Sequence, residues 1–170
     1  MSSAPLPIKE AIDLARRAGE PAFCERLRFG ALVGTPPESG DPGGWSYHTR
    51  VIRGAFSRSA PGIDLKQATV YPLKKTQSRF ADTLLIGRSE SNDVQIDQDS
   101  ISKLHARIRM TDAGMLIKDA GSKNGIYINY EPLEGEHALA DGDTVTLGHF
   151  MFQFHRPEEL YRMLCAAVVP

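Results

Sequence analysis

Cysteine, long apolar runs and net charge are what this chain of 170 residues has least of. It has only two cysteines, Cys24 and Cys165, and no CxxC pair or Cys/His cluster, so neither a zinc site nor a disulfide framework is expected. We predict buried free thiols, with a bridge between the two as the alternative. No apolar stretch is long enough for a membrane span. The formal net charge is -1, so any anion site must come from a local cluster.

Signals for targeting and for catalysis are also missing. The first seven residues lack a basic segment followed by an apolar run, which excludes a secretory signal and makes a cytoplasmic protein the expectation. We find no carboxylate pair, nucleophile–base motif, metal cluster or Walker-type loop, so we expect no enzyme, cofactor or metal. The basic residues are scattered and balanced by acids, which argues against nucleic-acid binding.

The first 33 residues are predicted to be a helical extension. Pro7 suits a first helical position, and Ile8, Ile12 and Ala15 recur on one face. Gly19 and Pro21 should end this helix. Phe23 and Leu27 are then spaced for one short further helix, which Gly30 ends.

Residues 34–63 are predicted to be a linker or irregular segment. Residues 34–44 are rich in Gly and Pro and almost free of apolar side chains, which excludes a helix or strand interior. One strand is possible within residues 47–56. Thr35 is followed by two prolines, and one hypothesis is a regulatory phosphorylation site here, whose phosphate folds back onto Arg88 and blocks it.

From residue 64 to residue 155 the pattern favours a β-sandwich, and residues 156–170 favour a final helix. Short apolar runs and alternating residues are separated by turn signals every 8–12 residues, as in sandwiches and barrels. Phe150, Phe152 and Phe154 form one predicted inward row. Pro157 suits a helix start, and the acidic residues that follow it complement the helix dipole. The fold class expected is therefore mainly β.

Polar residues concentrate where this sandwich would place its loops. The segments GRSESNDVQI, SISKLHARI, DAGSKNGIYIN and DGDTVTLG occur in this order. Together they resemble the forkhead-associated (FHA) domain family over roughly residues 68–155. The resemblance implies a sandwich of about eleven strands, with phosphothreonine recognised by loops at one end.

The resemblance implies a role for each polar loop residue. The planar guanidinium of Arg88 suits two phosphate oxygens, and Ser102 adds a compact hydroxyl donor. Lys103 supplies positive charge, Asn124 grips the main chain of the ligand, and Lys123 lines the same groove. A supporting role behind the ligand is expected for four further residues: Gly87, His105, Gly125 and Asn129. A catalytic role for His105 is not expected, because no nucleophile is paired with it.

The predicted function is a phosphothreonine-binding adaptor in a Ser/Thr kinase pathway. Its expected partners are Thr-phosphorylated proteins, either substrates or autophosphorylated forms of a kinase. The alternative is a phosphate-independent interaction scaffold that uses the sandwich surface or the terminal helices, since a minimal FHA domain needs neither helical extension.

Overall fold

The computed structural model describes residues 4–35, 67–76 and 79–167 of the chain. The possible strand within residues 47–56, and nearly all of the predicted linker, lie outside the described residues.

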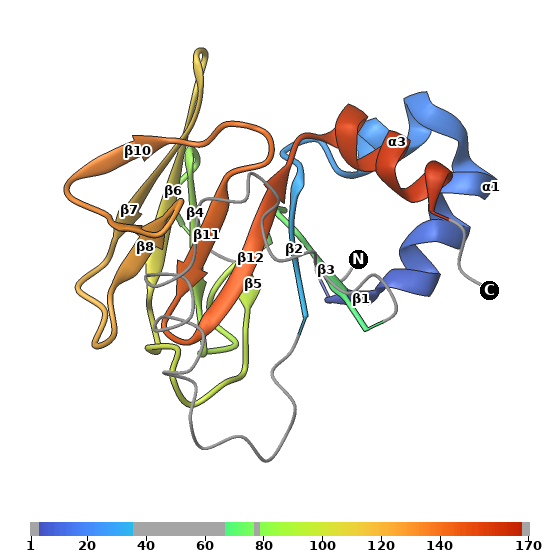
Figure 1. Cartoon of the computed structure of the whole chain (residues 1–170). Coiled ribbons are helices and arrows are strands. Elements are labelled where there is room, and N and C mark those ends of the chain that lie inside the picture. Colours follow the sequence, from blue (N-terminus) through green and yellow to red (C-terminus); the bar gives the residue numbers. More distant parts are fainter. Residues whose placement is uncertain (1–3, 36–66, 77–78, 168–170) are drawn as a thin grey trace.

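Within the described residues the strands form two sheets that face each other (Figure 1). The larger sheet contains β1 (Leu6–Pro7), β2 (Ala31–Gly34), β3 (Thr69–Pro72), β8 (Ile126–Ile128), β9 (Glu131–Pro132), β11 (Thr144–Leu147) and β12 (Phe150–His155). The smaller sheet contains β4 (Thr83–Gly87), β5 (Val94–Gln95), β6 (Ala106–Thr111), β7 (Gly114–Asp119) and β10 (Glu136–Ala138).

The strand order is β1-β3-β2-β12-β11-β8-β9 in the larger sheet and β10-β7-β6-β4-β5 in the smaller one. All neighbouring strands in the described part are antiparallel except β4 and β5, which run parallel. The predicted mainly β sandwich is therefore confirmed.

The main core lies between the two sheets. Phe152 and Phe154 of β12 are almost fully buried, and the ring of Phe152 packs edge-on against Tyr71 with the centroids 5.5 Å apart. On the smaller sheet, Ile108 of β6 and Ile117 of β7 bury the facing side. The alternation seen in the sequence thus identifies the inward residues correctly.

A second core lies between the larger sheet and the two helices, α1 (Ile8–Arg26) and α3 (Pro157–Ala166) (Figure 1). Helix α1 breaks at Gly19, where φ is 73°, so it consists of two helical segments, as the Gly/Pro pattern predicts. Helix α3 starts at Pro157, also as predicted. Neither of these helices is long and apolar enough to cross a membrane.

One boundary of the predicted helical extension is wrong. Residues 31–33 belong to β2, which lies between β3 and β12 in the larger sheet. Leu32 packs in the core between the sheets, whereas Ala31 and Val33 pack against the helices. Because both faces of β2 are covered, its sequence is an apolar run without the alternation that marks a half-exposed strand.

The two cysteines have free thiols, as expected, but they differ in exposure. Cys24 is half-buried, and burial, together with the charges of Glu158 and Glu20, raises the pKa of its thiol. Cys165 is exposed, so the prediction of burial is wrong for this residue. It lies near the end of α3 on a face that the second core does not cover.

Candidate functional site

Four chain segments meet at one end of the sandwich, the lower end in Figure 1. They are residues 87–92, 100–105, 119–125 and 148–149, which we call the recognition loops. Backbone and side-chain hydrogen bonds tie them together. The bonds are Arg88 N–H to Ser102 O (2.9 Å), Ser89 N–H to Lys103 O (3.2 Å), Lys123 N–H to Ser102 Oγ (3.0 Å) and His149 N–H to Ser100 Oγ (3.2 Å).

Arg88 follows directly after β4 and is half-buried. Its Nε–H donates to the carbonyl oxygen of Ile101 at 3.2 Å, which fixes the plane of the guanidinium group. Among the described residues, no carboxylate forms an ion pair with it. The two terminal NH₂ groups are therefore available to an acceptor from outside the domain.

Ser102 is held from both sides. Its backbone N–H donates to Nδ1 of His105 at 3.0 Å, and its Oγ accepts the Lys123 N–H. Among the described residues the hydroxyl accepts this bond and donates none, so its hydrogen can point at an outside acceptor.

His105 braces the recognition loops through both ring nitrogens. Since Nδ1 accepts from Ser102, the ring hydrogen lies on Nε2, which donates to the carbonyl oxygen of Gly125 at 3.0 Å. Burial lowers the pKa of His105 despite the opposing effects of the Gly125 carbonyl and Asp119. The neutral ring contacts backbone groups and not the Ser102 hydroxyl, so these two residues do not form a nucleophile–base pair.

Lys103, Lys123 and Asn124 complete the polar surface. Both lysines are exposed and form no ion pair within the described residues. Asn124 is half-buried, and its Nδ2 donates to the carbonyl oxygen of Ser100 at 2.8 Å. This bond orients the amide and leaves its Oδ1 and one N–H for a ligand main chain.

Gly87 is required by a close backbone approach. A Cβ at this position would collide with the carbonyl oxygen of Lys103 and would lie 2.9 Å from Nδ2 of Asn92. Asn92 itself is buried and donates to the carbonyl oxygens of Ser89 (2.8 Å) and Lys103 (2.6 Å). Gly87 and Asn92 together hold the Arg88 loop against the Ser102 loop.

Asp119 shapes the third loop. Its Oδ1 accepts the N–H groups of Gly121 (2.8 Å) and Ser122 (2.7 Å), and its Oδ2 accepts the Ser122 hydroxyl (2.9 Å). Burial raises the pKa of Asp119, but the bonds from Ser122 and Gly121 outweigh burial, and the pKa is lowered overall. Ser122 Oγ in turn accepts the N–H of Gly125 at 3.0 Å.

Asn92 and Asp119 were missed as supporting residues from the sequence. The signal for Asp119 was present, because an Asp with Gly and Ser two and three residues later is typical of a side-chain-capped turn. Asn92 gave no such signal, since its partner Lys103 lies in another loop.

Asn129 does not join the recognition loops. It follows β8, at the end of that strand opposite Gly125, and its Nδ2 donates to Oδ1 of Asp143 at 2.9 Å. Its Oδ1 accepts the N–H of Thr144 at 2.9 Å. With His137 it also lines a shallow hollow beside β9 and β10. Any supporting role of Asn129 therefore concerns the far end of the sandwich.

Thr35 follows β2, and its hydroxyl oxygen is buried without a hydrogen-bond partner among the described residues. Residues 36–66, which would have to fold back onto Arg88, lie outside the described part.

Among known protein families, residues 84–148 match the family model of the FHA domain. The chain carries an FHA domain. It is 38% identical over 72 residues to an oxoglutarate dehydrogenase inhibitor of Corynebacterium diphtheriae. The aligned segment covers 42% of this chain and 50% of that protein. The chain spans about half the length of such curated relatives.

Solved structures of FHA proteins are also similar to this chain. The FHA domain of the CT664 protein of Chlamydia trachomatis is 32% identical, with a TM-score of 0.41, over 43% of this chain and 75% of that one. EmbR of Mycobacterium tuberculosis, solved with a low-affinity phosphopeptide, is 32% identical, with a TM-score of 0.43, over 45% of this chain and 20% of that one. Within the described residues, this FHA domain holds no group of three or more His, Cys, Asp or Glu placed to bind a metal ion.

Proposed function

We propose that this FHA domain binds peptides that contain phosphothreonine. The observation that carries the proposal is the Arg88 guanidinium, held through Nε with its two NH₂ groups unpaired among the described residues, beside the free hydroxyl hydrogen of Ser102. A phosphothreonine carries about -1.5 to -2 charges and three acceptor oxygens. The charge and the donor geometry of this cluster match that group.

The five binding residues divide the recognition between them. Arg88 takes two phosphate oxygens and Ser102 takes one, while Lys103 and Lys123 add positive charge. Asn124 holds the main chain of the peptide next to the phosphorylated residue. Several charge-assisted bonds of this kind distinguish phosphate from hydroxyl by about 3 kcal/mol or more.

Selection of threonine over serine needs an apolar contact for the methyl group. Burial of one such group is worth about 0.8 kcal/mol, which corresponds to roughly a fourfold difference in Kd. A larger preference means that the β-branched side chain also limits the rotamers of the ligand.

Titration of one peptide in three forms tests the proposal. The phosphothreonine form should bind, the phosphoserine form should bind more weakly, and the unmodified form should not bind measurably. Arg88→Ala should weaken binding by about 100-fold, since two bonds to a charged group are lost. Arg17→Ala, an exposed arginine on α1, is the matched control and should have no effect. Binding that survives Arg88→Ala would refute the assignment of the site.

We further propose that the domain acts as a cytoplasmic adaptor without catalytic chemistry in a Ser/Thr kinase pathway. The Arg88–Ser102 cluster supports this role, because a site built for a phosphate group makes binding depend on phosphorylation of the partner. The partners would be Thr-phosphorylated proteins, such as kinase substrates or an autophosphorylated kinase. Complexes that survive phosphatase treatment would instead favour a phosphate-independent scaffold.

A further inference from the structure

Positive charge continues from the recognition loops onto the outer face of the smaller sheet. Lys103 precedes β6 and Lys123 follows β7, and these strands carry Arg107 and Lys118. Both of the latter side chains are exposed, whereas Ile108 on the opposite face of β6 is buried. The cationic surface of the binding site is therefore wider than the phosphate cluster.

Arg107 and Lys118 are cross-strand partners in the register of β6 and β7. Directly opposite residues in an antiparallel pair have Cβ atoms about 4.5–5.5 Å apart, and like charges in these positions are destabilising. A sheet face of purely structural importance would gain stability from an acid at one of the two positions. An anion from outside would relieve the repulsion between these two side chains.

The carboxylate nearest in register does not neutralise this pair. Glu136 of β10 lies opposite Lys118, but its Oε2 is bound to Arg109 at 2.8 Å. Within the described residues, neither Arg107 nor Lys118 forms an ion pair. Arg107, Arg109 and Lys118 are cations and Glu136 is the one carboxylate among them, so these four side chains carry two net positive charges.

Both positions are within reach of a bound peptide. Lys118 directly precedes Asp119, where the third recognition loop begins. Arg107 lies four residues beyond Lys103, which is about 13 Å along an extended chain. A peptide held at Ser102 and Asn124 spans that distance with about four residues.

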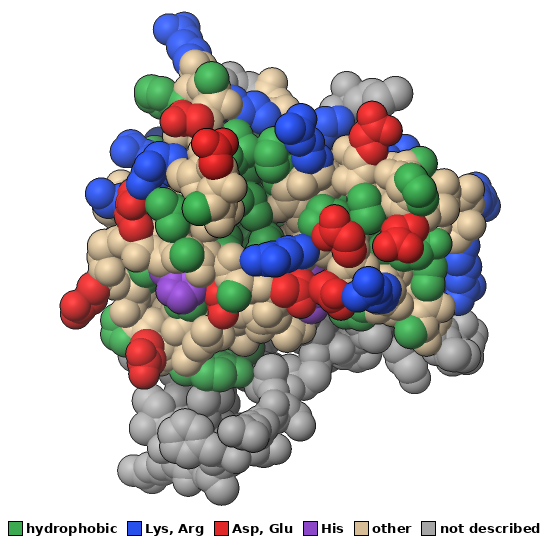
Figure 2. All heavy atoms as spheres, turned by 90° about the horizontal axis from the view of Figure 1, so that it is seen from above, with side chains coloured by type: hydrophobic (Ala, Val, Ile, Leu, Met, Phe, Trp, Pro, Cys, Tyr) green, Lys and Arg blue, Asp and Glu red, His purple; other side chains and the backbone are tan. Residues whose placement is uncertain are grey.

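We propose that Arg107 and Lys118 form a subsite for Asp or Glu side chains that flank the phosphothreonine. The inference rests on the proposed function and deepens it, because it defines the class of partner as a phosphothreonine with an acidic run on one side. The far end of the molecule offers no such field, since acidic and basic side chains are interspersed there (Figure 2).

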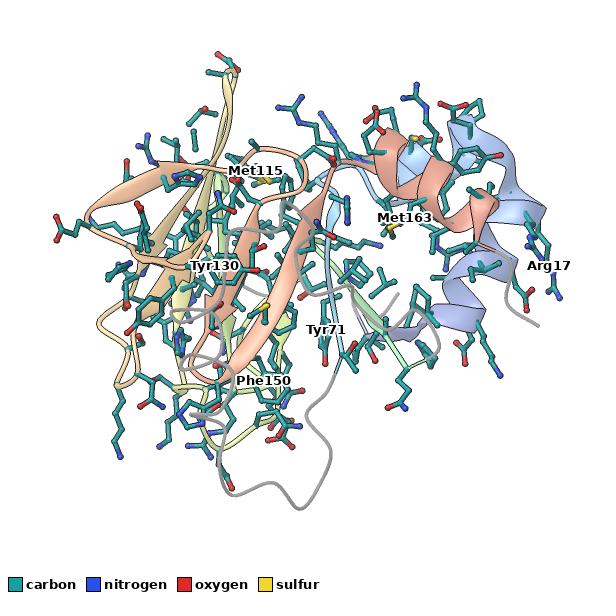
Figure 3. The ribbon with its side chains drawn as sticks, in the orientation of Figure 1. Arg17, Tyr71, Met115, Tyr130, Phe150 and Met163 are labelled. Atoms are coloured by element: carbon teal, nitrogen blue, oxygen red, sulfur yellow. The ribbon has the colours of Figure 1, made fainter. Side chains whose placement is uncertain are left out.

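Three phosphothreonine peptides with one shared core test the subsite. One has Gln in both flanks, one has three Glu before the core, and one has three Glu after it. They are titrated against the full chain, against R107Q/K118Q, and against the control K9Q/R17Q. The control changes the net charge equally, and its residues are exposed on α1, on the side of the molecule away from the smaller sheet (Figure 3).

One acidic flank should lower the Kd of the full chain and of the control by about threefold to tenfold at low salt, as expected for two exposed ion pairs. This gain should shrink as salt rises. R107Q/K118Q should lose it and still bind the Gln-flanked peptide within about twofold of the full chain. Thermal unfolding establishes that both variants are folded.

Two results would overturn the subsite while leaving the proposed function intact. In the first, the Gln-flanked phosphopeptide binds but neither acidic flank improves binding. In the second, R107Q/K118Q retains the full gain. If the Gln-flanked peptide binds no better with phosphate than without it, the proposed function itself fails, and the subsite fails with it.

Discussion

The two ends of the sandwich are each organised by a buried polar side chain, but this side chain is a charged carboxylate at one end and a neutral imidazole at the other. At the far end, Asp143 accepts hydrogen bonds from Asn129 (2.9 Å), His137 (2.8 Å) and the N–H of Ala140 (2.9 Å). At the loop end, neutral His105 binds only backbone groups. The charge of Asp143 is thus neutralised by donors inside the domain. At the loop end Asp119 likewise bonds only to groups of its own loop, and His105 is neutral, so neither forms an ion pair with the cations of the recognition loops.

Asp143→Ala should have the largest effect on stability and none on binding. It removes the shared acceptor of three donors in a site where Asp143 is only 9% exposed. We expect the free energy of unfolding to fall by about 3 kcal/mol, measured by urea denaturation. The Kd for a phosphopeptide should stay within twofold at a temperature where the variant is folded.

Asp112→Ala is the control for this substitution. Asp112 is an exposed carboxylate in the turn between β6 and β7, so its removal should change stability by less than about 0.5 kcal/mol. A weaker phosphopeptide complex in folded Asp143→Ala would mean that the two ends are coupled and that the comparison fails.

His105→Phe should affect both stability and binding. It keeps the ring volume but leaves the N–H of Ser102 and the carbonyl oxygen of Gly125 without their partner. We expect a loss of about 2 kcal/mol, since buried unsatisfied groups cost about 1–3 kcal/mol each and part of the cost is relieved by water. Phosphopeptide affinity should fall about tenfold because Ser102 loses its orientation. Urea denaturation measures the loss of stability, and calorimetric titration of the folded variant measures the affinity. Unchanged affinity would show that His105 does not position Ser102.

Much of this architecture could be predicted from the sequence, because its signals are local. Alternation identified the inward row of β12, and Gly19 with Pro21 marked the break in α1. The motif residues Arg88, Ser102 and Asn124 indeed lie in loops that meet at one end. Each of these features depends on neighbours within a few residues, or on a motif that brings its own spacing.

The features that were missed depend on partners far away in the sequence. Strand β2 is buried on both faces only because α1 and α3 cover the larger sheet. Asn129 was grouped with the recognition loops on motif order, although β8 carries it to the opposite end. The sequence gives no sign that Arg107 and Lys118 belong together, because only the β6–β7 register shows that they oppose each other.

Alanine substitution at two glycines, one at each end of the sandwich, compares the ends with a similar backbone strain at both positions. Gly148 has φ of 59° and Gly142 has φ of 84°, so alanine is strained at both. A Cβ at Gly148 would also collide with the backbone of Ser100, whereas one at Gly142 meets nothing within 4 Å. Gly142→Ala should therefore cost about 1 kcal/mol and leave binding intact.

Gly148→Ala should cost about 2 kcal/mol or more and weaken phosphopeptide binding, because the Ser100 segment that orients Asn124 must move. Chemical denaturation and peptide titration on both variants make the comparison. Equal effects of the two substitutions would show that the close contact with Ser100 has no importance.

The smallest expected effect is a dependence of stability on pH between 5.5 and 7.5. Burial lowers the pKa of His105 below its ordinary value of 6.5, and burial lowers that of His155 at the far end as well. Below pH 6.5 the unfolded chain therefore takes up protons before the folded chain does, so stability falls as pH falls.

Each histidine contributes a slope of at most about 1.4 kcal/mol per pH unit. The lowered pKa values of Asp119 and Asp143 stabilise the fold above their ordinary range, and that contribution is lost only below about pH 5. The window above pH 5.5 therefore isolates the histidines. His105→Phe and His155→Phe should each reduce the slope of the free energy of unfolding against pH. Only His105→Phe should also change phosphopeptide affinity. If the slope of His105→Phe equals that of the original chain, the buried ring at the recognition loops is not the group that titrates.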